Sequence, residues 1–487
     1  MAFAVPDEIK ALTHALETAG FEAYLVGGCV RDLLLNKTPK DWDITTNAAP
    51  EDIQRVFPDS FYENDFGTVG VKTESEDDTL RVIEVTPYRL EAEYKDARRP
   101  ESVTWAKSLK EDLARRDFTI NAIGCSVSRN ELVDPHGGQD DLKRKSIAAV
   151  GDAHERFAED ALRMLRAVRL SAELDFTIET ATAAAIAAHA DTLKKISRER
   201  VRDELVRVIE SSNPMQALAV LQRLGLLKHI IPELEDGIGC GQNQAHSFDV
   251  FEHLLRSLQH AADKEYPFEV RLAALLHDVG KPASRRWSDE KKDYTFHGHE
   301  VIGARMAKKI LKDLRFSAET TDMVYKLVRW HMFFSDPDKI TLSAVRRMIR
   351  NVGTKNIEHL LNLRICDRIG TGRPKEQPFR FRKYKSMVDE ALRDPISVSM
   401  LKIDGVRLME ITGEKPGPKI GWVLHALLEE VLDDPSLNTA EYLERRATEL
   451  MRLPESELKE MGEKGKGRRE DEDLKEIEAL RKKHHVS

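Results

Sequence analysis

Residues 24–46 read YLVGGCVRDLLLNKTPKDWDITT, and this segment indicates the fold of the N-terminal part of the chain. A short apolar run ends at Gly27 and Gly28, which lack a β-carbon and let the backbone turn sharply and approach a ligand. The next residues predict a short helix whose free N–H groups face the turn and favour an anion. Arg31 adds a forked cationic donor. A Gly-Gly pair alone is usually an ordinary turn. The residues that follow it must therefore show whether this turn binds phosphate.

That sequel is the alternation of Asp41 and Asp43 with Trp42 and Ile44. In a strand, the period of two places both carboxylates on one face. Neighbouring carboxylates repel each other, and next to a phosphate-binding turn they indicate a divalent cation with oxygen ligands. An isolated Asp-x-Asp is more typical of a solvated strand end, but the spacing of the Gly-Gly pair, Arg31 and the two aspartates favours a metal site.

The segments GGCVRDLLL and DWDITT together resemble the head signature of the nucleotidyltransferase superfamily, specifically class II tRNA nucleotidyltransferases and bacterial poly(A) polymerases. The resemblance implies that Gly27, Gly28 and Arg31 bind phosphates and that Asp41 and Asp43 hold Mg²⁺. Bacterial poly(A) polymerases carry a GRRF-like segment soon after these carboxylates, where this chain has FGTVGV (residues 66–71). The difference favours CCA addition over polyadenylation.

The composition predicts a soluble protein of several domains. The chain has 487 residues and a net charge of -8, which argues against nonspecific coating of nucleic acid but leaves room for local basic patches. Its four cysteines are dispersed without a CxxC pair, as in a reducing cytosol. No signal peptide and no run of 18 apolar residues is present, so we expect a cytoplasmic protein without a membrane role.

Two further features belong to the predicted head. Glu84 stands among apolar residues in LRVIEVTPYR, where a carboxylate is costly unless it serves a metal or an ion pair, so it is a candidate third catalytic carboxylate. The segment after it loses apolar periodicity and carries Arg98 and Arg99, as expected of a mobile basic loop. It is equally consistent with solvated surface. It resembles the flexible loop that class II enzymes use for the A-addition step, and Arg98 and Arg99 are RNA-binding candidates.

The segment EDLARRDFTINAIG contributes Arg116, Asp117 and Asn121. Paired arginines suit a triphosphate, and they suit a salt-bridged helix end equally well. The resemblance favours nucleotide binding by all three residues.

The segment FAEDALRMLRAVRL predicts a helix in which Asp160 and Arg163 share one face, with Arg166 and Arg169 at helical spacings behind them. Most such pairs are surface ion pairs. A carboxylate beside an arginine also complements the Watson–Crick edges of both C and A, whereas G and U present the reverse pattern. The segment resembles the class II EDxxR motif, which implies selection of CTP and ATP without a template and a nucleotide-binding role for Arg166 and Arg169.

A histidine-rich helical region begins near residue 237. Single histidines on apolar helix faces are usually core residues, but the set resembles the HD phosphohydrolase superfamily. The resemblance implies a four-ligand site with two further ligands in binuclear members. Imidazole and carboxylate ligands suit a transition metal such as Mn, Ni, Co or Fe. The six implied ligands are His253, His277, Asp278, His299, His331 and Asp367.

The segment GRPKEQPFRFRKYK interleaves Phe379, Phe381 and Tyr384 with basic residues and is the best local candidate for RNA contact. A basic loop beside the HD core is an equally good interpretation. The basic candidates are Arg373, Arg380, Arg382, Lys383 and Lys385.

The predicted fold class is α+β, a mixed-sheet head followed by helices. The expected segments are a catalytic head (1–148), a nucleotide-selecting neck (149–235), an HD domain (236–395), a helical tRNA-binding region (396–454) and a charged tail, disordered or a solvated helix (455–487). The leading hypothesis is two-metal addition of CCA to the tRNA 3′ end from CTP and ATP, with an accessory HD hydrolase. The alternatives are an A-adding enzyme, a poly(A) polymerase, or an RNA-end phosphohydrolase. The sequence leaves the oligomeric state undefined.

Overall fold

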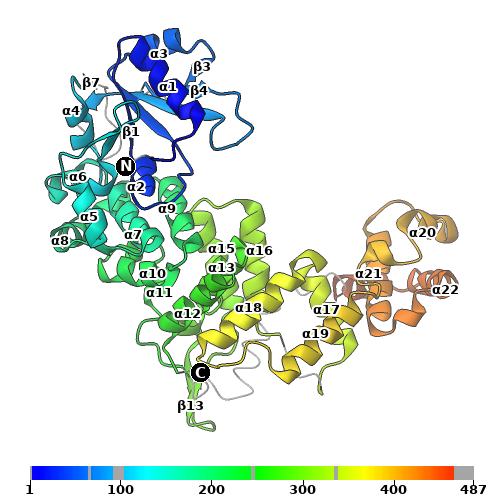
Figure 1. The fold of residues 1–487 in the computed structure, drawn as a ribbon. Coiled ribbons are helices and arrows are strands. Elements are labelled where there is room, and N and C mark those ends of the chain that lie inside the picture. Colours follow the sequence, from blue (N-terminus) through cyan, green and yellow to red (C-terminus); the bar gives the residue numbers. More distant parts are fainter. Residues whose placement is uncertain (1–2, 64–66, 91–103, 243–246, 334–337, 465–487) are drawn as a thin grey trace. The chain divides into compact units, whose positions relative to one another are not determined.

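Figure 1 shows the fold of the chain as a computed structural model. The chain forms two compact units, residues 1–230 and 231–487. Across the part of the chain that the structure describes, none of the helices has the length and hydropathy needed to cross a lipid bilayer. The described residues are 3–63, 67–90, 104–242, 247–333 and 338–464.

The first unit is built on a seven-stranded mixed sheet with the order β3-β4-β5-β2-β1-β8-β9. Strand β2 runs parallel to β5 and antiparallel to β1, and its register places Asp43 opposite Glu84 on one side and Val26 on the other. All four residues of β1 are buried, as the apolar run predicted. The strands are β1 (Ala23–Val26), β2 (Asp43–Thr46), β3 (Ser60–Tyr62), β4 (Val69–Lys72), β5 (Val82–Pro87), β8 (Gly124–Ser126) and β9 (Glu131–Val133).

Short helices flank this sheet, and longer helices follow it. Helix α1 buries Ile9, Leu12 and Leu16 on one face. The helices of this unit are α1 (Asp7–Thr18), α2 (Gly28–Leu34), α3 (Pro50–Val56), α4 (Leu109–Ala114), α5 (Gly138–Arg144), α6 (Ala153–Glu159), α7 (Leu162–Leu174), α8 (Thr180–His189), α9 (Arg198–Glu210) and α10 (Pro214–Arg223). The α+β fold class is thus confirmed.

The helix predicted across residues 157–170 is interrupted. It is α6 and α7, separated by Asp160 in an extended conformation. The Asp160 carboxylate accepts a hydrogen bond from the backbone N–H of Leu162 at 3.0 Å. Aspartate side chains compete for backbone donors in this way and favour helix starts over helix interiors. The prediction that Asp160 and Arg163 share one face of a continuous helix is therefore wrong.

The second unit is helical apart from the hairpin β12 (Arg286–Ser288) and β13 (Asp293–Thr295). Five helices, α12, α13, α15, α16 and α18, lie together at its centre (Figure 1). They bury apolar side chains and a group of histidines. The helices are α11 (Pro232–Glu235), α12 (Val250–Asp263), α13 (Phe268–Leu276), α14 (Lys281–Ser284), α15 (His299–Asp313), α16 (Ala318–Trp330), α17 (Leu342–Val352), α18 (Ile357–Gly370), α19 (Phe379–Ala391), α20 (Gly405–Thr412), α21 (Pro418–Asp433), α22 (Ala440–Leu450) and α23 (Glu455–Lys464).

The charged C-terminal segment begins with the helix α23. Leu458 on this helix is fully buried, and a β-carbon at Gly462 would lie 2.5 Å from the Cα atom of Trp422 in α21. Of the two predictions for the tail, a helix is right for residues 455–464, but this helix packs against α21 and is not solvated on all sides. The rest of the predicted tail lies outside the described residues.

Candidate functional site

The carboxylates of the sequence motif gather at one edge of the first sheet. Asp43 begins β2, opposite Glu84 of β5, and Asp41 lies two residues earlier on an exposed bend. Burial and the charge of Asp41 raise the pKa of Asp43, although Arg116 and Arg166 oppose the shift. Partial desolvation and the charges of Asp43 and Asp41 likewise raise the pKa of Glu84. Such mutual repulsion is what a divalent cation relieves, so these residue types fit a metal.

The apolar neighbours of Glu84 in the sequence do not surround it, because Ile83 and Val85 point into the core while Glu84 is exposed on the other face of β5. Strand alternation explains this result: apolar neighbours in sequence lie on the opposite face. The oxygens of Asp41, Asp43 and Glu84 do not meet within 4.8 Å of one another, unlike the ligand groups found elsewhere among the described residues.

The glycine turn allows a close approach to these carboxylates. Gly27 has a φ of 77°, and a β-carbon there would lie 3.1 Å from Asp43 Oδ2 and 3.3 Å from an Arg116 amino nitrogen. Glycine is favoured on both counts, because side chains avoid positive φ and because the space is already filled. Arg116 thus stands next to Asp43, which places a cation beside the predicted metal site.

A polar network connects this turn to the helices behind it. Arg31 donates to the Asn121 side-chain oxygen at 3.0 Å, and Asn121 donates to Asp117 at 3.3 Å. Asp117 also pairs with Arg166 at 2.8 Å. Burial would raise the pKa of Asp117, but Arg166, Arg163 and these hydrogen bonds hold it below its usual range. Four residues predicted as nucleotide contacts therefore form one charged network in the first unit.

The side chains of Asp160 and Arg163 have different partners, although the Arg163 backbone N–H donates to the Asp160 carbonyl oxygen at 3.0 Å. Arg163 is buried and donates to Glu159 at 2.5 Å, while Asp160 accepts from Arg200 at 2.7 Å. The cause is the break in the helix, which turns the Asp160 side chain away from the face of α7. Sequence reasoning missed Glu159 as the partner, although its i,i+4 spacing to Arg163 was a usable signal.

Two other arginines have structural partners. Arg169 is buried and pairs with Glu204 at 2.7 Å and Glu173 at 3.2 Å, which favours a packing role over the predicted nucleotide contact. Arg116 also pairs with Asp112, a fully buried carboxylate that the sequence interpretation overlooked. Asp112 on α4 precedes Arg116 by four residues, just past the end of the helix, so helical spacing could have found it.

The second unit brings all six predicted histidine and aspartate ligands together. One group unites His253, His277, Asp278 and Asp367, and its ligand atoms all lie within 4.8 Å of one another. A second group unites Asp278 with His299 and His331. Asp278 belongs to both: its Oδ2 lies 3.1 Å from His253 Nε2, and its Oδ1 lies 3.2 Å from His299 Nε2. This arrangement suits two neighbouring cations that share one carboxylate.

The orientation of the imidazoles supports this interpretation. Nδ1 of His277, His299 and His331 lies 2.9, 2.7 and 2.6 Å from the backbone oxygens of Ala274, Phe296 and Val328. A proton on Nδ1 satisfies each of these oxygens and directs Nε2 toward the cluster, where it can bind a cation once it carries no proton of its own. The buried donor set therefore fits a transition metal.

We expect cation binding at this cluster to release a proton. Burial lowers the pKa of His277, but the carboxylates of Asp278 and Asp367 outweigh it and raise the pKa to about 9. At neutral pH, His277 therefore holds a proton that a cation must displace, so affinity should rise up to tenfold per pH unit below about 9. Titration calorimetry with Mn²⁺ in buffers of different ionisation heat measures this release. Affinity independent of pH from 6.5 to 8.5 would contradict it.

Only some side chains of the predicted RNA-contact segment are exposed. Phe381 and Tyr384 are buried, and Tyr384 stacks on Phe333 with ring centroids 5.0 Å apart. The alternation of aromatic and basic residues is thus the core and solvent pattern of α19, and of the three interleaved aromatics only Phe379 is exposed. Arg382 and Lys385 lie on the exposed face, and Lys383 pairs with Asp338 at 3.0 Å.

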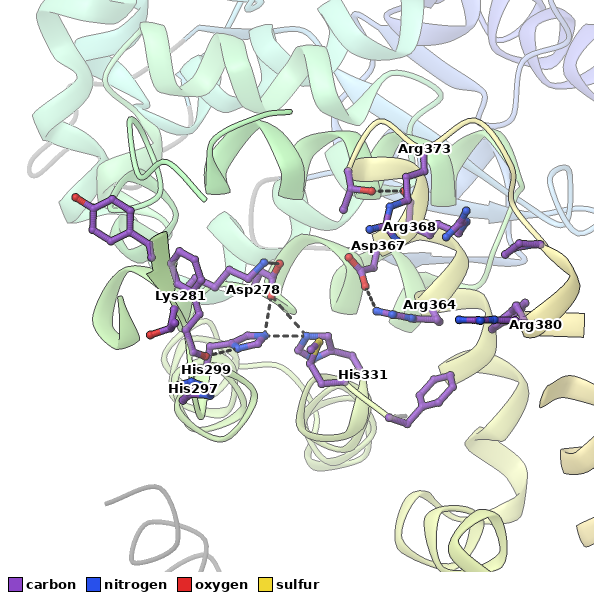
Figure 2. A pocket seen from close by; sticks show the side chains of 18 of the residues that line it. Asp278, Lys281, His297, His299, His331, Arg364, Asp367, Arg368, Arg373 and Arg380 are labelled. Carbon is purple, nitrogen blue, oxygen red and sulfur yellow. Dashed lines mark hydrogen bonds and ion pairs between the residues drawn. The ribbon is translucent and has the colours of Figure 1, made fainter. Parts of the chain in front are cut away.

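Arg373 and Arg380 line a pocket of about 1050 Å³ whose wall includes Asp278 and Asp367 (Figure 2). Arg364 also lines it and pairs with Asp367 at 2.5 Å. Sequence reasoning missed Arg364, although it precedes Asp367 by three residues on α18. The loop candidates Arg98 and Arg99 lie outside the described residues.

Three family models match the chain. Residues 23–148 match the Poly A polymerase head domain. Residues 175–238 match a model described as "Probable RNA and SrmB- binding site of polymerase A". Residues 245–369 match the HD domain.

Similar proteins agree with these matches. A CCA-adding enzyme of Lactobacillus delbrueckii subsp. bulgaricus is 33% identical over 426 residues, which cover 86% of this chain and 91% of the relative. One from Enterococcus faecalis is 46% identical over 219 residues, 44% of this chain and about half (52%) of the relative. The crystal structure of the Bacillus stearothermophilus CCA-adding enzyme in complex with CTP is 27% identical, with a TM-score of 0.67 over 92% of this chain and 97% of that one.

Proposed function

This chain belongs to the CCA-adding enzymes, which are tRNA nucleotidyltransferases, and we propose that it builds CCA on the tRNA 3′ end from CTP and ATP. The observation that carries the proposal is the position of Asp43, which pairs in register with Glu84 and lies next to the turn at Gly27 and beside Arg116. Carboxylates, a close-approach turn and a cation are the parts that transfer of a nucleotidyl group from a triphosphate requires.

Each part has a role in the transfer. Mg²⁺ held by Asp41 and Asp43 would neutralise the triphosphate and favour ionisation of the tRNA 3′-hydroxyl. Gly27, Gly28 and Arg31 bind phosphate oxygens. The hydroxyl oxygen forms a bond to the α-phosphorus of the nucleotide while the bond to pyrophosphate breaks. The network through Asn121 and Asp117 keeps Arg31 and Arg166 in place, so that little ordering is left to the moment of reaction.

The experiment that tests this function offers the protein three tRNA transcripts, ending before CCA, after C and after CC, with CTP, ATP or both. Extension of the shortest transcript by CCA and no further is the expected result. Extension of only the CC-ended transcript by one A would mark an A-adding enzyme. A long A tail would mark a poly(A) polymerase, and no extension of any transcript would refute the proposal.

We place nucleotide selection at Asp160 and Arg163. Because Arg163 donates to Glu159 and Asp160 accepts from Arg200, both side chains must exchange partners to meet the edge of C or A. Their present partners keep both charges satisfied until a base arrives, since a buried charge without a partner is costly.

Asp160→Ala is therefore expected to weaken discrimination against UTP by roughly 10- to 100-fold, because the carboxylate no longer distinguishes an amino group from a carbonyl oxygen. The measurement is the ratio of kcat/KM for CTP and UTP on the transcript ending before CCA. Glu155→Ala, at an exposed site of α6, is the matched control. An unchanged ratio in Asp160→Ala would remove this residue from base selection.

A second activity is favoured by the ligand groups of the second unit, and we propose metal-dependent hydrolysis of a phosphoester there. A transition metal held by His253, His277, Asp278 and Asp367, with a second at His299 and His331, would supply an activated water at neutral pH. Lys281 lies 2.6 Å from both Asp278 Oδ2 and the Gln242 side-chain oxygen, which balances the charge of Asp278. The substrates considered are RNA ends with 2′,3′-cyclic phosphates or 2′-phosphates. A structural HD domain is the competing interpretation.

A further inference from the structure

The pocket beside the histidine cluster is larger than a single phosphate requires. Its volume is about 1050 Å³, at the upper end of the roughly 300–1000 Å³ typical of sites for small organic ligands. Figure 2 shows four arginines on one side of Asp278 and His331, with Lys281 and His299 on the other. The cluster thus lines only part of this cavity, and four arginines line another part of it.

The arginine side comes from one continuous piece of chain. Arg364 and Arg368 stand one turn apart on α18, Arg373 lies in the following loop, and Arg380 is the second residue of α19. Arg364 pairs with Asp367, and the Arg368 side chain donates to the backbone oxygen of Lys375 at 2.6 Å. These contacts fix the inner two guanidinium groups, while Arg373 and Arg380 are exposed farther along the wall. The row therefore leads from the ligand cluster to the pocket mouth.

Anionic groups do not balance this row. The described lining residues include four carboxylates, Asp278, Asp293, Asp367 and Glu376, and six cationic side chains, Lys281, Lys291, Arg364, Arg368, Arg373 and Arg380. Two of the pairs lie within the lining, Asp278 with Lys281 and Asp367 with Arg364, whereas Glu376 pairs with Lys264 at 2.8 Å, outside it. A ligand with several negative charges matches this excess, whereas one phosphate is satisfied by one or two cations.

Aromatic surface accompanies the charges. Phe379 lines the pocket between Pro378 and Arg380 and is 71% exposed, which is unusual for a phenylalanine. The half-buried Tyr294 also lines the pocket, with the Arg285 guanidinium stacked on its ring at 3.6 Å from the centroid, so Phe379 is the ring left exposed. Cationic side chains beside an exposed aromatic ring suit a nucleotide chain, because the cations follow the backbone and the ring stacks on an unpaired base.

We propose that this pocket takes the end of a single-stranded nucleotide chain that contributes at least three phosphates, one at the histidine cluster and two along Arg373 and Arg380. The proposal rests on the hydrolase function proposed above and specifies its substrate class. Water adds its oxygen to the phosphorus of the last phosphodiester in the chain, the bond from that phosphorus to one ribose oxygen breaks, and that ribose oxygen takes the proton released by the water. A nucleotide and a shortened chain leave.

The test compares Arg373→Ala/Arg380→Ala, whose two sites are exposed, with Lys309→Ala/Lys312→Ala, which makes the same charge change on the exposed face of α15. Binding of fluorescein-labelled pentauridylate to the full chain in EDTA is followed by anisotropy at several salt concentrations. Arg373→Ala/Arg380→Ala should weaken binding at least about tenfold. It should also reduce the slope of log Kd against log salt by about 1.4, since each phosphate contact on a single strand contributes about 0.7. The lysine control should match the parent chain.

A second arm measures hydrolysis with Mn²⁺. The arginine variant should lose at least about tenfold in kcat/KM on pentauridylate and much less on bis(p-nitrophenyl) phosphate, which has one phosphate. Phe379→Ala should weaken pentauridylate binding without changing the salt slope. Unchanged binding in the arginine variant, or an equal loss on both substrates, would overturn the proposal. If the parent chain hydrolyses neither substrate, the hydrolase function fails, and the EDTA binding arm still decides whether the wall holds a nucleotide chain.

Discussion

Replacing Asp43 with asparagine is expected to reduce CCA addition by at least about 10³-fold, because removal of a metal-holding charge forfeits several kcal/mol of transition-state stabilisation. Asparagine keeps the volume of the side chain in β2 and removes only the charge. Asp43 faces Glu84 across two hydrogen-bonded strands and adjoins Arg116, so it stands at the centre of the proposed transfer site. The measurement is single-turnover addition of C to a transcript ending before CCA.

Loss of fold would not explain this result. Since the folded protein raises the pKa of Asp43, the ionised carboxylate opposes folding at neutral pH. Asp43→Asn should therefore keep or increase the free energy of unfolding, as measured by urea denaturation. Asp59→Asn, at an exposed aspartate before β3 that pairs with Lys72 at 3.4 Å, is the control and should retain transfer. Transfer within tenfold of the parent chain in Asp43→Asn would refute the metal assignment.

Asp278→Asn is expected to abolish metal binding at both ligand groups of the second unit and to reduce hydrolysis of bis(p-nitrophenyl) phosphate by on the order of 10³-fold. The reason is geometric: the two carboxylate oxygens of Asp278 face different groups, one toward His253 and one toward His299. Elemental analysis of Mn²⁺-loaded protein should give two ions per parent chain and none in the variant. CCA addition by the first unit should continue.

The variant also disturbs a buried charge cluster. Lys281 and His277 outweigh the effect of burial and hold the pKa of Asp278 well below its usual range. The ionised carboxylate therefore stabilises the folded state at pH values above the ordinary pKa of an aspartate. Its removal costs stability on the order of 3 kcal/mol. His299→Gln is therefore the informative companion, because His299 belongs only to the second group and this variant should keep one of two ions. Two ions in Asp278→Asn would contradict the shared-ligand arrangement.

The local motifs were readable because their chemistry lies within a few residues. For the turn at Gly27 and the aspartates around Trp42, spacing alone sets which residues share a face. The histidine and aspartate ligands extend from residue 253 to residue 367, and the family resemblance, not their spacing, predicted that they meet. Helical spacing would also have revealed the pairs Glu159–Arg163 and Arg364–Asp367 had it been applied to every charge.

What the sequence alone determined is the mixed head followed by helices, the family resemblance and the six histidine and aspartate residues that the structure gathers into two candidate ligand groups. Partner choice needed the tertiary structure. Asp160 turns to Arg200, 40 residues away, and Phe381 and Tyr384 turn into the core of their unit. Periodicity predicts which residues share a face of a helix or strand, but it does not predict which other part of the chain packs against that face. Neighbours distant in the chain decide whether a charge is satisfied, a ring is buried or an arginine is left to line a pocket.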